Sequence, residues 1–237
     1  MHTDVQRIVD TDALESKSAQ EIVTWAAQEF GAGLGLASSF GAEDVVLIDM
    51  LMQANPKGRI FTLDTGRLNQ ETYDVMDKIR TKYSCAIETY FPDASRVESM
   101  VREKGFNLFY ESIDHRKLCC NIRKVEPLNR ALAAGLKAWM TGLRREQVVT
   151  RAAVKKIERD DAHKMYKLNP LAEWTWNQVW EYIRANKVPY NALHDQGYPS
   201  IGCEPCTRAV KTGEDFRAGR WWWELPEQKE CGLHVKH

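Results

Sequence analysis

Short apolar runs alternate with amphipathic segments along the first third of the chain. Helical patterns are expected over Ser18–Phe30, Glu43–Gln53 and Gln70–Tyr83. Between them lie the compact apolar runs Leu34–Ser38 and Arg59–Asp64, which are typical of buried strands. Strands that alternate with helices in this order indicate a parallel sheet. The predicted fold class is therefore α/β, with a mostly parallel sheet flanked by helices.

The middle of the chain carries a weaker pattern. Ala86–Tyr90 and Lys137–Thr141 are the candidate third and fourth strands. Between them, we interpret Asn107–Leu118 as a polar connection and Cys120–Ala134 as a helix, despite Pro127. If that helix begins near Cys119, Lys124 lies one turn past Cys120 on the same face.

A charged segment and an aromatic helix follow. Gln147–Asp160 is poor in apolar residues, so Arg151 and Lys155-Lys156 are expected on a solvated face. Thr175 can cap a helix that begins at Trp176 and carries apolar residues at i, i+3, i+4 and i+7. This aromatic stripe is predicted to pack in the core rather than to stack on bases.

Small and polar residues follow the predicted strands. The turn Ser39–Ala42 leads from a strand into a helix, where backbone N–H groups and the helix dipole favour an anion. Ser and Gly also make ordinary strand-to-helix turns, so this signal is weak. In open parallel sheets, ligands bind outside the carboxyl ends of the strands. The loop residues expected to share one pocket are Ser39, Thr65, Arg67, Gly142 and Arg144.

Length and charge exclude several function classes. The chain has 237 residues, 43% of them hydrophobic, which is enough for a full core. Lys+Arg and Asp+Glu are equal at 33 each, so there is no global basic surface for nucleic acid. No apolar run approaches the roughly 18 residues that span a bilayer, and the N-terminus lacks a signal peptide's apolar stretch. We therefore expect a cytoplasmic protein without membrane contact.

Four of the six cysteines form two pairs, Cys119-Cys120 and Cys203–Cys206. Thiolates are the ligands that suit iron–sulfur clusters and zinc. Neighbouring side chains diverge by about 100° on a helix, which a 4Fe-4S cube with its separated corners accepts more readily than tetrahedral zinc. A cluster is the favoured interpretation. Zinc, and reduced or disulfide-forming cysteines, remain alternatives.

One cysteine pair has an alternative interpretation, and the two remaining cysteines, Cys85 and Cys231, have separate ones. The Cys203–Cys206 motif also resembles a thioredoxin-type dithiol, although it follows a loop here. Cys85 is interpreted as a small buried hydrophobic residue. Cys231 lies near the C-terminus in a segment expected to be mobile, where an accessible thiolate close to His234 could act as a nucleophile. A merely solvated terminal residue is the alternative.

Several separate stretches together match the pattern of one protein family. They are Ser38–Asp44, Leu63–Arg67, Cys119-Cys120 with Arg123-Lys124, Thr141–Arg145, Ile201–Arg208, Gly219–Trp223 and Lys229–His234. In these stretches the chain resembles the assimilatory adenylyl-sulfate and phosphoadenylyl-sulfate reductases. Because both cysteine pairs are present, the chain is similar to the cluster-bearing adenylyl-sulfate branch.

The resemblance implies an adenine nucleotide alpha-hydrolase-like fold and a 4Fe-4S cluster on Cys119, Cys120, Cys203 and Cys206. It implies that the Cys231 thiolate attacks the sulfur of adenosine 5′-phosphosulfate, expels AMP and becomes an S-sulfocysteine. Reduced thioredoxin, a separate partner, would then release sulfite. The implied substrate-binding residues are Ser38, Ser39, Phe40, Gly41, Leu63, Thr65, Arg67, Lys124, Gly142, Arg144, Arg151, Arg217, Arg220 and His234.

The resemblance also implies a division of the chain and leaves alternatives. We expect a polar segment at 1–17, a nucleotide-binding domain with the cluster site at 18–210, and a tail with the nucleophile at 211–237. The Ser38–Asp44 loop lacks the paired glycines of ATP-using relatives, which argues against ATP activation and a tRNA sulfur-transfer enzyme. A reductase that takes 3′-phosphoadenylyl sulfate, or both substrates, and a non-enzymatic iron–sulfur sensor remain open, as does homo-oligomerisation.

Overall fold

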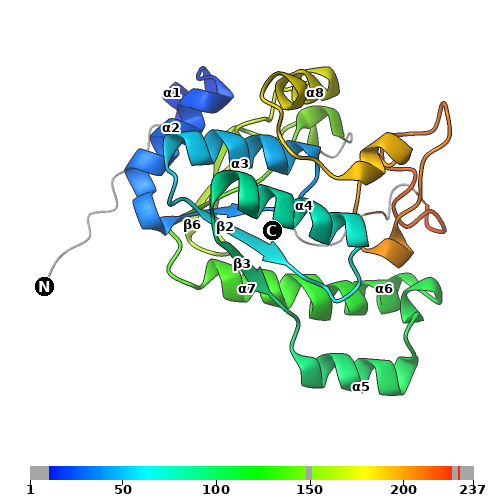
Figure 1. The fold of residues 1–237 in the computed structure, drawn as a ribbon. Helices are drawn as coiled ribbons and strands as arrows, with labels where there is room; N and C mark the ends of the chain where they lie inside the picture. The colour runs from blue at the N-terminus through cyan, green and yellow to red at the C-terminus, as the bar shows by residue number, and fades with distance from the viewer. Residues whose placement is uncertain (1–10, 148–150, 226–228, 230–237) are drawn as a thin grey trace, which may run out of the picture.

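A twisted sheet stands between two layers of helices (Figure 1). The computed structural model describes residues 11–147, 151–225 and 229. Within them, six strands form one sheet in the order β3-β2-β1-β4-β6-β5. Only β5 among these strands is antiparallel to its neighbour. The strands are β1 Leu34–Ala37, β2 Arg59–Leu63, β3 Ile87–Tyr90, β4 Ala138–Met140, β5 Ile157–Asp160 and β6 Met165–Leu168.

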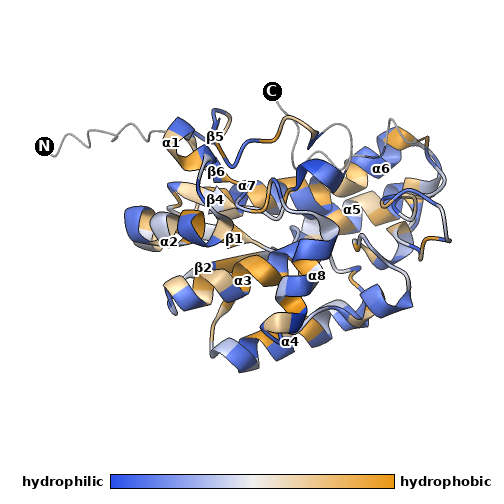
Figure 2. Ribbon diagram, turned by 90° about the horizontal axis from the view of Figure 1, so that it is seen from above, coloured by the Kyte–Doolittle hydropathy of each residue, from blue (hydrophilic) through white to orange (hydrophobic). Residues whose placement is uncertain are grey.

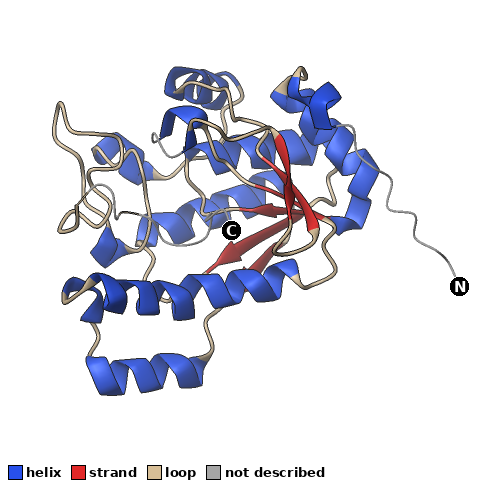
Figure 3. Cartoon of the chain, turned by 180° about the vertical axis from the view of Figure 1, so that it is seen from behind, coloured by secondary structure: helices blue, strands red, loops and turns tan. Residues whose placement is uncertain are grey.

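Helices cover both faces of the sheet. They are α1 Thr11–Glu15, α2 Ala19–Phe30, α3 Ala42–Ala54, α4 Gln70–Tyr83, α5 Ala94–Lys104, α6 Ile113–Cys120, α7 Glu126–Leu132 and α8 Trp176–Ala185. The first face carries α2, α3, α4 and α8. The second face carries α7, which continues from α6, and α5 lies outermost on that side, as the view from behind also shows (Figure 3).

Helix α3 is the centre of the main core. Almost all of its residues are buried, because α2, α8 and the sheet surround it. Figure 2 shows it in hydrophobic colours along much of its length, whereas α4 alternates between hydrophilic and hydrophobic. A helix that is apolar on all sides belongs in a core, and one with a single apolar stripe belongs at the surface.

The predicted α/β fold class is confirmed. The four predicted strands are present as β1 to β4, and the predicted helices correspond to α2, α3 and α4 within one or two residues. Thr175 caps α8 as predicted, with its side chain accepting the Gln178 N–H. The aromatic residues of α8 pack against the main core, and Cys85 is buried there too. No helix in the described residues is long and apolar enough to span a membrane.

The segment before the first cysteine pair differs from its prediction. Asn107–Leu118 is not a plain connection, because α6 already begins at Ile113, where the Ser112 side chain accepts the His115 N–H. A π-helical segment, Asn121–Val125, then joins α6 to α7. Pro127, which has no N–H to donate, lies in the first turn of α7, directly after the π-helical segment. The paired cysteines therefore end a helix rather than begin one.

The charged segment after residue 147 also differs from its prediction. Its second half forms β5, which pairs with β6 at the edge of the sheet. Lys156 is not solvated: its Nζ donates to the carbonyls of Glu15 (2.7 Å) and Lys17 (2.9 Å) and pairs with Glu173. Strand β5 lies at the edge of the sheet, where charged side chains are tolerated. Its charged residues therefore hid the apolar pattern by which a strand is recognised. Helix α5 carried no prediction.

Candidate active site

A pocket of about 210 Å³ opens at the carboxyl ends of β1, β2 and β4. Strands β1 and β4 are neighbours, and the strand order reverses between them. This is the topological switch point at which ligands bind in open α/β sheets. Ser38, Thr65 and Gly142, each just past the end of one of these strands, line it.

The turn between β1 and α3 is fixed by its own side chains. The Ser39 N–H and Oγ both donate to Asp44 Oδ2, at 2.7 and 2.8 Å. The Phe40 N–H donates to Ser38 Oγ at 3.1 Å, and Phe40 adopts a left-handed φ of 59° that turns its ring into the core. Burial raises the pKa of Asp44 to about 6, although the hydrogen bonds from Ser39 oppose the rise. The Ser39 and Phe40 N–H groups, which could have met an anion, thus donate within the turn.

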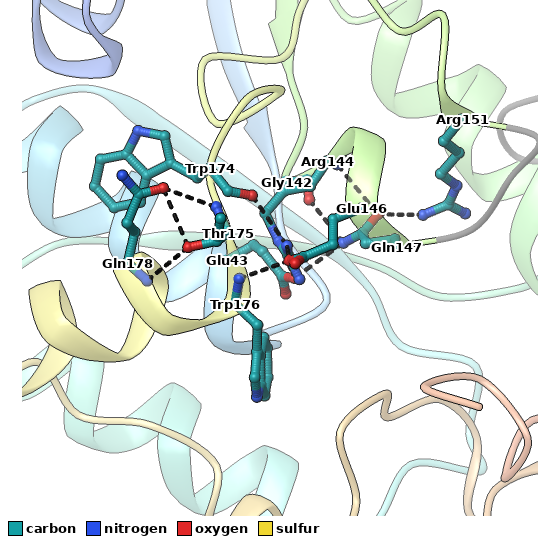
Figure 4. Close-up of polar contacts among 10 residues, drawn as sticks. All are labelled: Glu43, Gly142, Arg144, Glu146, Gln147, Arg151, Trp174, Thr175, Trp176 and Gln178. Atoms are coloured by element: carbon teal, nitrogen blue, oxygen red, sulfur yellow. Dashed lines mark hydrogen bonds and ion pairs between the residues drawn. The ribbon is translucent and has the colours of Figure 1, made fainter. Parts of the chain in front are cut away.

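The opposite loop follows β4 and contacts this turn closely. A Cβ at Gly142 would lie 2.6 Å from Asp44 Oδ1, so only glycine fits. Arg144 is buried behind the pocket, where its Nε donates to Glu43 Oε1 at 2.8 Å and its Nη1 to Glu146 Oε2 at 2.7 Å (Figure 4). These contacts hold the two loops together.

The lining of the pocket is rich in basic side chains. Lys124, Arg151, Arg217 and Arg220 all line it. Arg220 is buried, and its Nη1 donates to Ser200 Oγ (3.3 Å) and to the Ile201 carbonyl (3.2 Å). In a chain with no net charge, this local concentration of cations favours an anionic ligand.

The two cysteine pairs meet beside the pocket. Cys119, Cys120, Cys203 and Cys206 line one small cavity, and Lys124 lines both this cavity and the pocket. Thr65 Oγ1 lies 3.2 Å from Cys203 Sγ. Among the residues described, no three His, Cys, Asp or Glu side chains are arranged to hold a single metal ion.

The surroundings act differently on individual thiols. Burial and the charge of Cys203 raise the pKa of Cys206 to about 12. Burial also acts to raise the pKa of Cys203. Lys124, the Thr65 hydroxyl and Arg220 together outweigh burial and leave that pKa below its ordinary value. Trp221 Nε1 is buried at this cavity and has no hydrogen-bond partner in the described part of the chain.

Most of the predicted substrate-binding residues line the pocket. They are Ser38, Ser39, Gly41, Leu63, Thr65, Lys124, Gly142, Arg151, Arg217 and Arg220. Three others do not line it. Phe40 lies in the core, Arg144 lies behind the pocket, and Arg67 lines the cysteine cavity, where its Nη1 donates to the Phe106 carbonyl at 2.8 Å. Cys231 and His234 lie outside the described residues.

Several residues that line the pocket were not predicted from the sequence. Asp44, Gln147 and Phe216 line the pocket, as does His194 from the segment after α8. Asp44 is the last residue of the Ser38–Asp44 stretch, and Phe216 directly precedes Arg217, so their positions in the sequence could have indicated them. Gln147 and His194 carried no such signal.

The raised pKa of Asp44 predicts a pH-dependent stability. The folded chain holds this proton more tightly than the unfolded chain, because the pKa is about 6 instead of 3.8. The stabilisation from this proton is therefore complete below the pKa that Asp44 has in the unfolded chain, 3.8. It is lost as the pH rises through the pKa of Asp44 in the folded chain, about 6. The free energy of unfolding of the wild type minus that of Asp44→Asn should fall by about 2 kcal/mol between about pH 4.5 and pH 8 in anaerobic urea titrations. A flat difference would contradict the raised pKa.

Comparisons with known proteins place this site in a family. Residues 33–209 match the model of the phosphoadenosine phosphosulfate reductase domain. An adenosine 5′-phosphosulfate reductase from Allochromatium vinosum is 49% identical over 97% of this chain and 90% of its own. The crystal structure of a Candida auris phosphoadenylyl-sulfate reductase, in a phosphate complex, has a TM-score of 0.72 and 32% identity over 84% of this chain and 96% of its own.

A more distant structure supports the fold alone. The Candida glabrata FMN adenylyltransferase, in complex with FAD and pyrophosphate, has a TM-score of 0.56 and 16% identity over 98% of this chain and 79% of its own. Together with the 32% identical Candida auris structure, it confirms the expected adenine nucleotide alpha-hydrolase-like fold. With a family model that spans most of the described chain and a relative matched over nearly its whole length, this chain belongs to the phosphoadenosine phosphosulfate reductase family.

Proposed function

We propose that this chain reduces adenosine 5′-phosphosulfate to sulfite and AMP in assimilatory sulfate reduction. The names of its relatives supply the substrate class. The observation that carries the proposal is the position of Lys124, whose side chain lines both the basic pocket and the four-cysteine cavity. The Lys124 ammonium group thereby lies between the pocket proposed for an anionic nucleotide and the four-cysteine cavity.

The pocket suits a nucleotide that carries a phosphosulfate. The β1, β2 and β4 loops supply small and apolar surfaces such as Leu63 and Gly142 for the adenosine. Lys124, Arg151 and Arg220 supply positive charge for the phosphosulfate. Negative charge accumulates on the sulfonyl and leaving phosphate oxygens during transfer, so cations held in place stabilise the transition state more than the ground state.

The four-cysteine cavity fits a 4Fe-4S cluster. Cys119, Cys120, Cys203 and Cys206 would supply its four thiolates, and they surround a single cavity. Trp221 Nε1, which has no hydrogen-bond partner among the described residues, would donate to a sulfur acceptor there. When bound, the cluster would supply a fixed negative charge beside Lys124. The adjacent cysteine pair supports a cluster over zinc, which is the competing occupant.

The chemical step would use the thiolate of Cys231. It attacks the sulfur of the substrate, the bond from sulfur to the phosphate oxygen breaks, and AMP leaves with the electron pair. The product is S-sulfocysteine. A reduced thioredoxin then attacks the Cys231 sulfur through one of its two thiols, which releases sulfite and ends in oxidised thioredoxin. The two electrons come from the thioredoxin dithiol, so the cluster need not change its oxidation state.

A second candidate takes 3′-phosphoadenylyl sulfate, alone or in addition. The 32% identical Candida auris structure is named for that activity. Such a substrate needs a further cation near the ribose 3′ position. Competition between the two nucleotides for one enzyme, measured as the ratio of kcat/KM values, separates the candidates. A non-enzymatic sensor would release no sulfite from either.

The first prediction of this proposal concerns metal content. Anaerobically purified protein should be brown and hold about four irons and four labile sulfides per chain, because four cysteine ligands complete a 4Fe-4S cube. Iron, zinc and sulfide analysis tests this. Stoichiometric zinc without sulfide would refute it. Cys85→Ser is the matched control and should retain full iron, since Cys85 is buried in the main core instead.

The second prediction concerns Lys124. Lys124→Ala should keep its iron and lower kcat/KM by roughly a hundredfold or more, as expected for one lost charge-stabilising contact in the transition state. The exposed Lys117 on α6 provides the control, and Lys117→Ala should retain wild-type turnover. Near-normal turnover of Lys124→Ala would show that this cation does not act on the substrate.

The third prediction concerns Cys231. Cys231→Ser should retain fold, cluster and AMP binding but form no sulfite, because a hydroxyl is scarcely ionised at neutral pH. The wild type, mixed with substrate without thioredoxin, should release about one AMP per chain and gain a sulfonate on the Cys231 peptide. Peptide mass spectrometry locates the added group. Its appearance on another cysteine, or sulfite formation by Cys231→Ser, would assign the nucleophile elsewhere.

A further inference from the structure

Gln147 connects a buried ion pair with a cation of the pocket (Figure 4). Its Nε2 donates to Glu43 Oε1 at 3.0 Å and to the Gly142 carbonyl at 3.1 Å. Its Oε1 accepts from the Arg144 N–H at 3.2 Å and from Arg151 Nη1. The side-chain amide of Gln147 therefore donates two hydrogen bonds and accepts two, all to residues of the site.

The chemistry of these neighbours fixes the orientation of the amide. Glu43 and the Gly142 carbonyl can only accept hydrogen bonds, so they require the NH₂ end of Gln147. Arg151 can only donate, so it requires the oxygen end. A flipped amide would lose all of these contacts at once. Gln147 thus has one orientation, and that orientation presents an acceptor to Arg151.

The base of this connection is rigid. Arg144 is buried and pairs with Glu43 and Glu146. Its guanidinium carbon also lies 5.6 Å from the Trp176 ring centroid. Because both side chains are buried and bonded, the Glu43 carboxylate and the Arg144 guanidinium keep a fixed geometry.

The chain beyond Arg151 is held as well. Arg145 Nε donates to the Val154 carbonyl at 2.8 Å. Lys156 is tied to the Glu15 and Lys17 carbonyls. With the backbone on that side held by these contacts, the remaining freedom of Arg151 is largely that of its long side chain. The hydrogen bond from Arg151 Nη1 to Gln147 Oε1 is one contact that restrains this side chain.

We propose that Gln147 is a positioning residue, which holds the Arg151 guanidinium toward the anionic group of the bound nucleotide. It acts through Arg151 and does not itself touch the reacting atoms. This inference rests on the proposed function for the identity of the ligand, but the coupling itself concerns only nucleotide binding. It predicts that the contribution of Gln147 to binding and turnover exists only while Arg151 is present.

A double-mutant cycle with AMP as the probe tests the coupling. Gln147→Met keeps the side-chain volume and removes all four hydrogen bonds. It should weaken AMP binding and lower kcat/KM by roughly tenfold, since displacing a positioned group by about 1 Å can cost up to a hundredfold. In an Arg151→Met background, the same change should alter AMP affinity less than about twofold, because the coupled effect is already lost. Calorimetric titration of the four proteins gives the values.

Gln178→Met is the matched control. Gln178 accepts from the Thr175 N–H at 2.8 Å in the cap of α8 and does not line the pocket. This variant should lose thermal stability and bind AMP like the wild type, which separates a loss of stability from a loss of positioning. Gln147→Asn, which keeps the amide but shortens its reach, replaces Gln147→Met if the latter does not fold, and the same losses are expected.

The inference is overturned if Gln147→Met binds AMP like the wild type, if Arg151→Met alone has no effect, or if the two losses simply multiply. Failure of the proposed function gives a different result. In that case the wild type would release no sulfite from adenosine 5′-phosphosulfate, while the four-protein cycle with AMP would still show the coupling.

Discussion

The buried ion pair between Glu43 and Arg144 fixes the distance between the two loops that form the pocket. Glu43 lies in the first turn of α3, which follows β1, and Arg144 follows β4. Removing one partner of a buried pair leaves an uncompensated charge and costs about 3–5 kcal/mol, although an apolar pair of the same volume could be as stable. The pair therefore specifies geometry more than it adds stability. The close contact of Gly142 with Asp44 depends on the same spacing.

The cysteine cavity depends on a second local constraint, the π-helical segment after α6. The Glu126 N–H bonds to the Asn121 carbonyl, five residues earlier, instead of the usual four. The extra residue in this turn rotates the following side chains relative to an α-helical register. Lys124 lies within the segment and lines both cavities. Such turns often occur at functional sites, because they redirect side chains while the helix continues.

The sequence predicted the fold where each element has one strong pattern. Helix α4 and the strands beside β1 were recognisable from apolar runs and periodicity, whereas the alternating charges of β5 masked an edge strand. In the site, helical spacing predicted Lys124 one turn past Cys120 for a helix that begins near Cys119. Lys124 does line the cysteine cavity, although the helix begins earlier, at Ile113, and the turn is π-helical. The direction of the Arg144 side chain could not be predicted, since it depends on a partner about 100 residues away. Gln147 belongs to no motif, and its role follows only from the four groups around it.

The hydrogen bonds of the β1–α3 turn also decide which part of a nucleotide it can hold. A phosphate-binding turn needs free backbone N–H groups at the start of the helix. Here the Ser39 N–H donates to Asp44 and the Phe40 N–H to Ser38, and two acidic residues occupy the first turn of α3. An anion would meet carboxylates there, whereas Lys124 offers positive charge beside the cysteine cavity. The nucleoside end of the ligand is therefore expected at the turn and its anionic end near Lys124, beside the cysteines. This polarity follows from the loop's own carboxylates, and it distinguishes the pocket from sites that hold a polyphosphate on backbone amides.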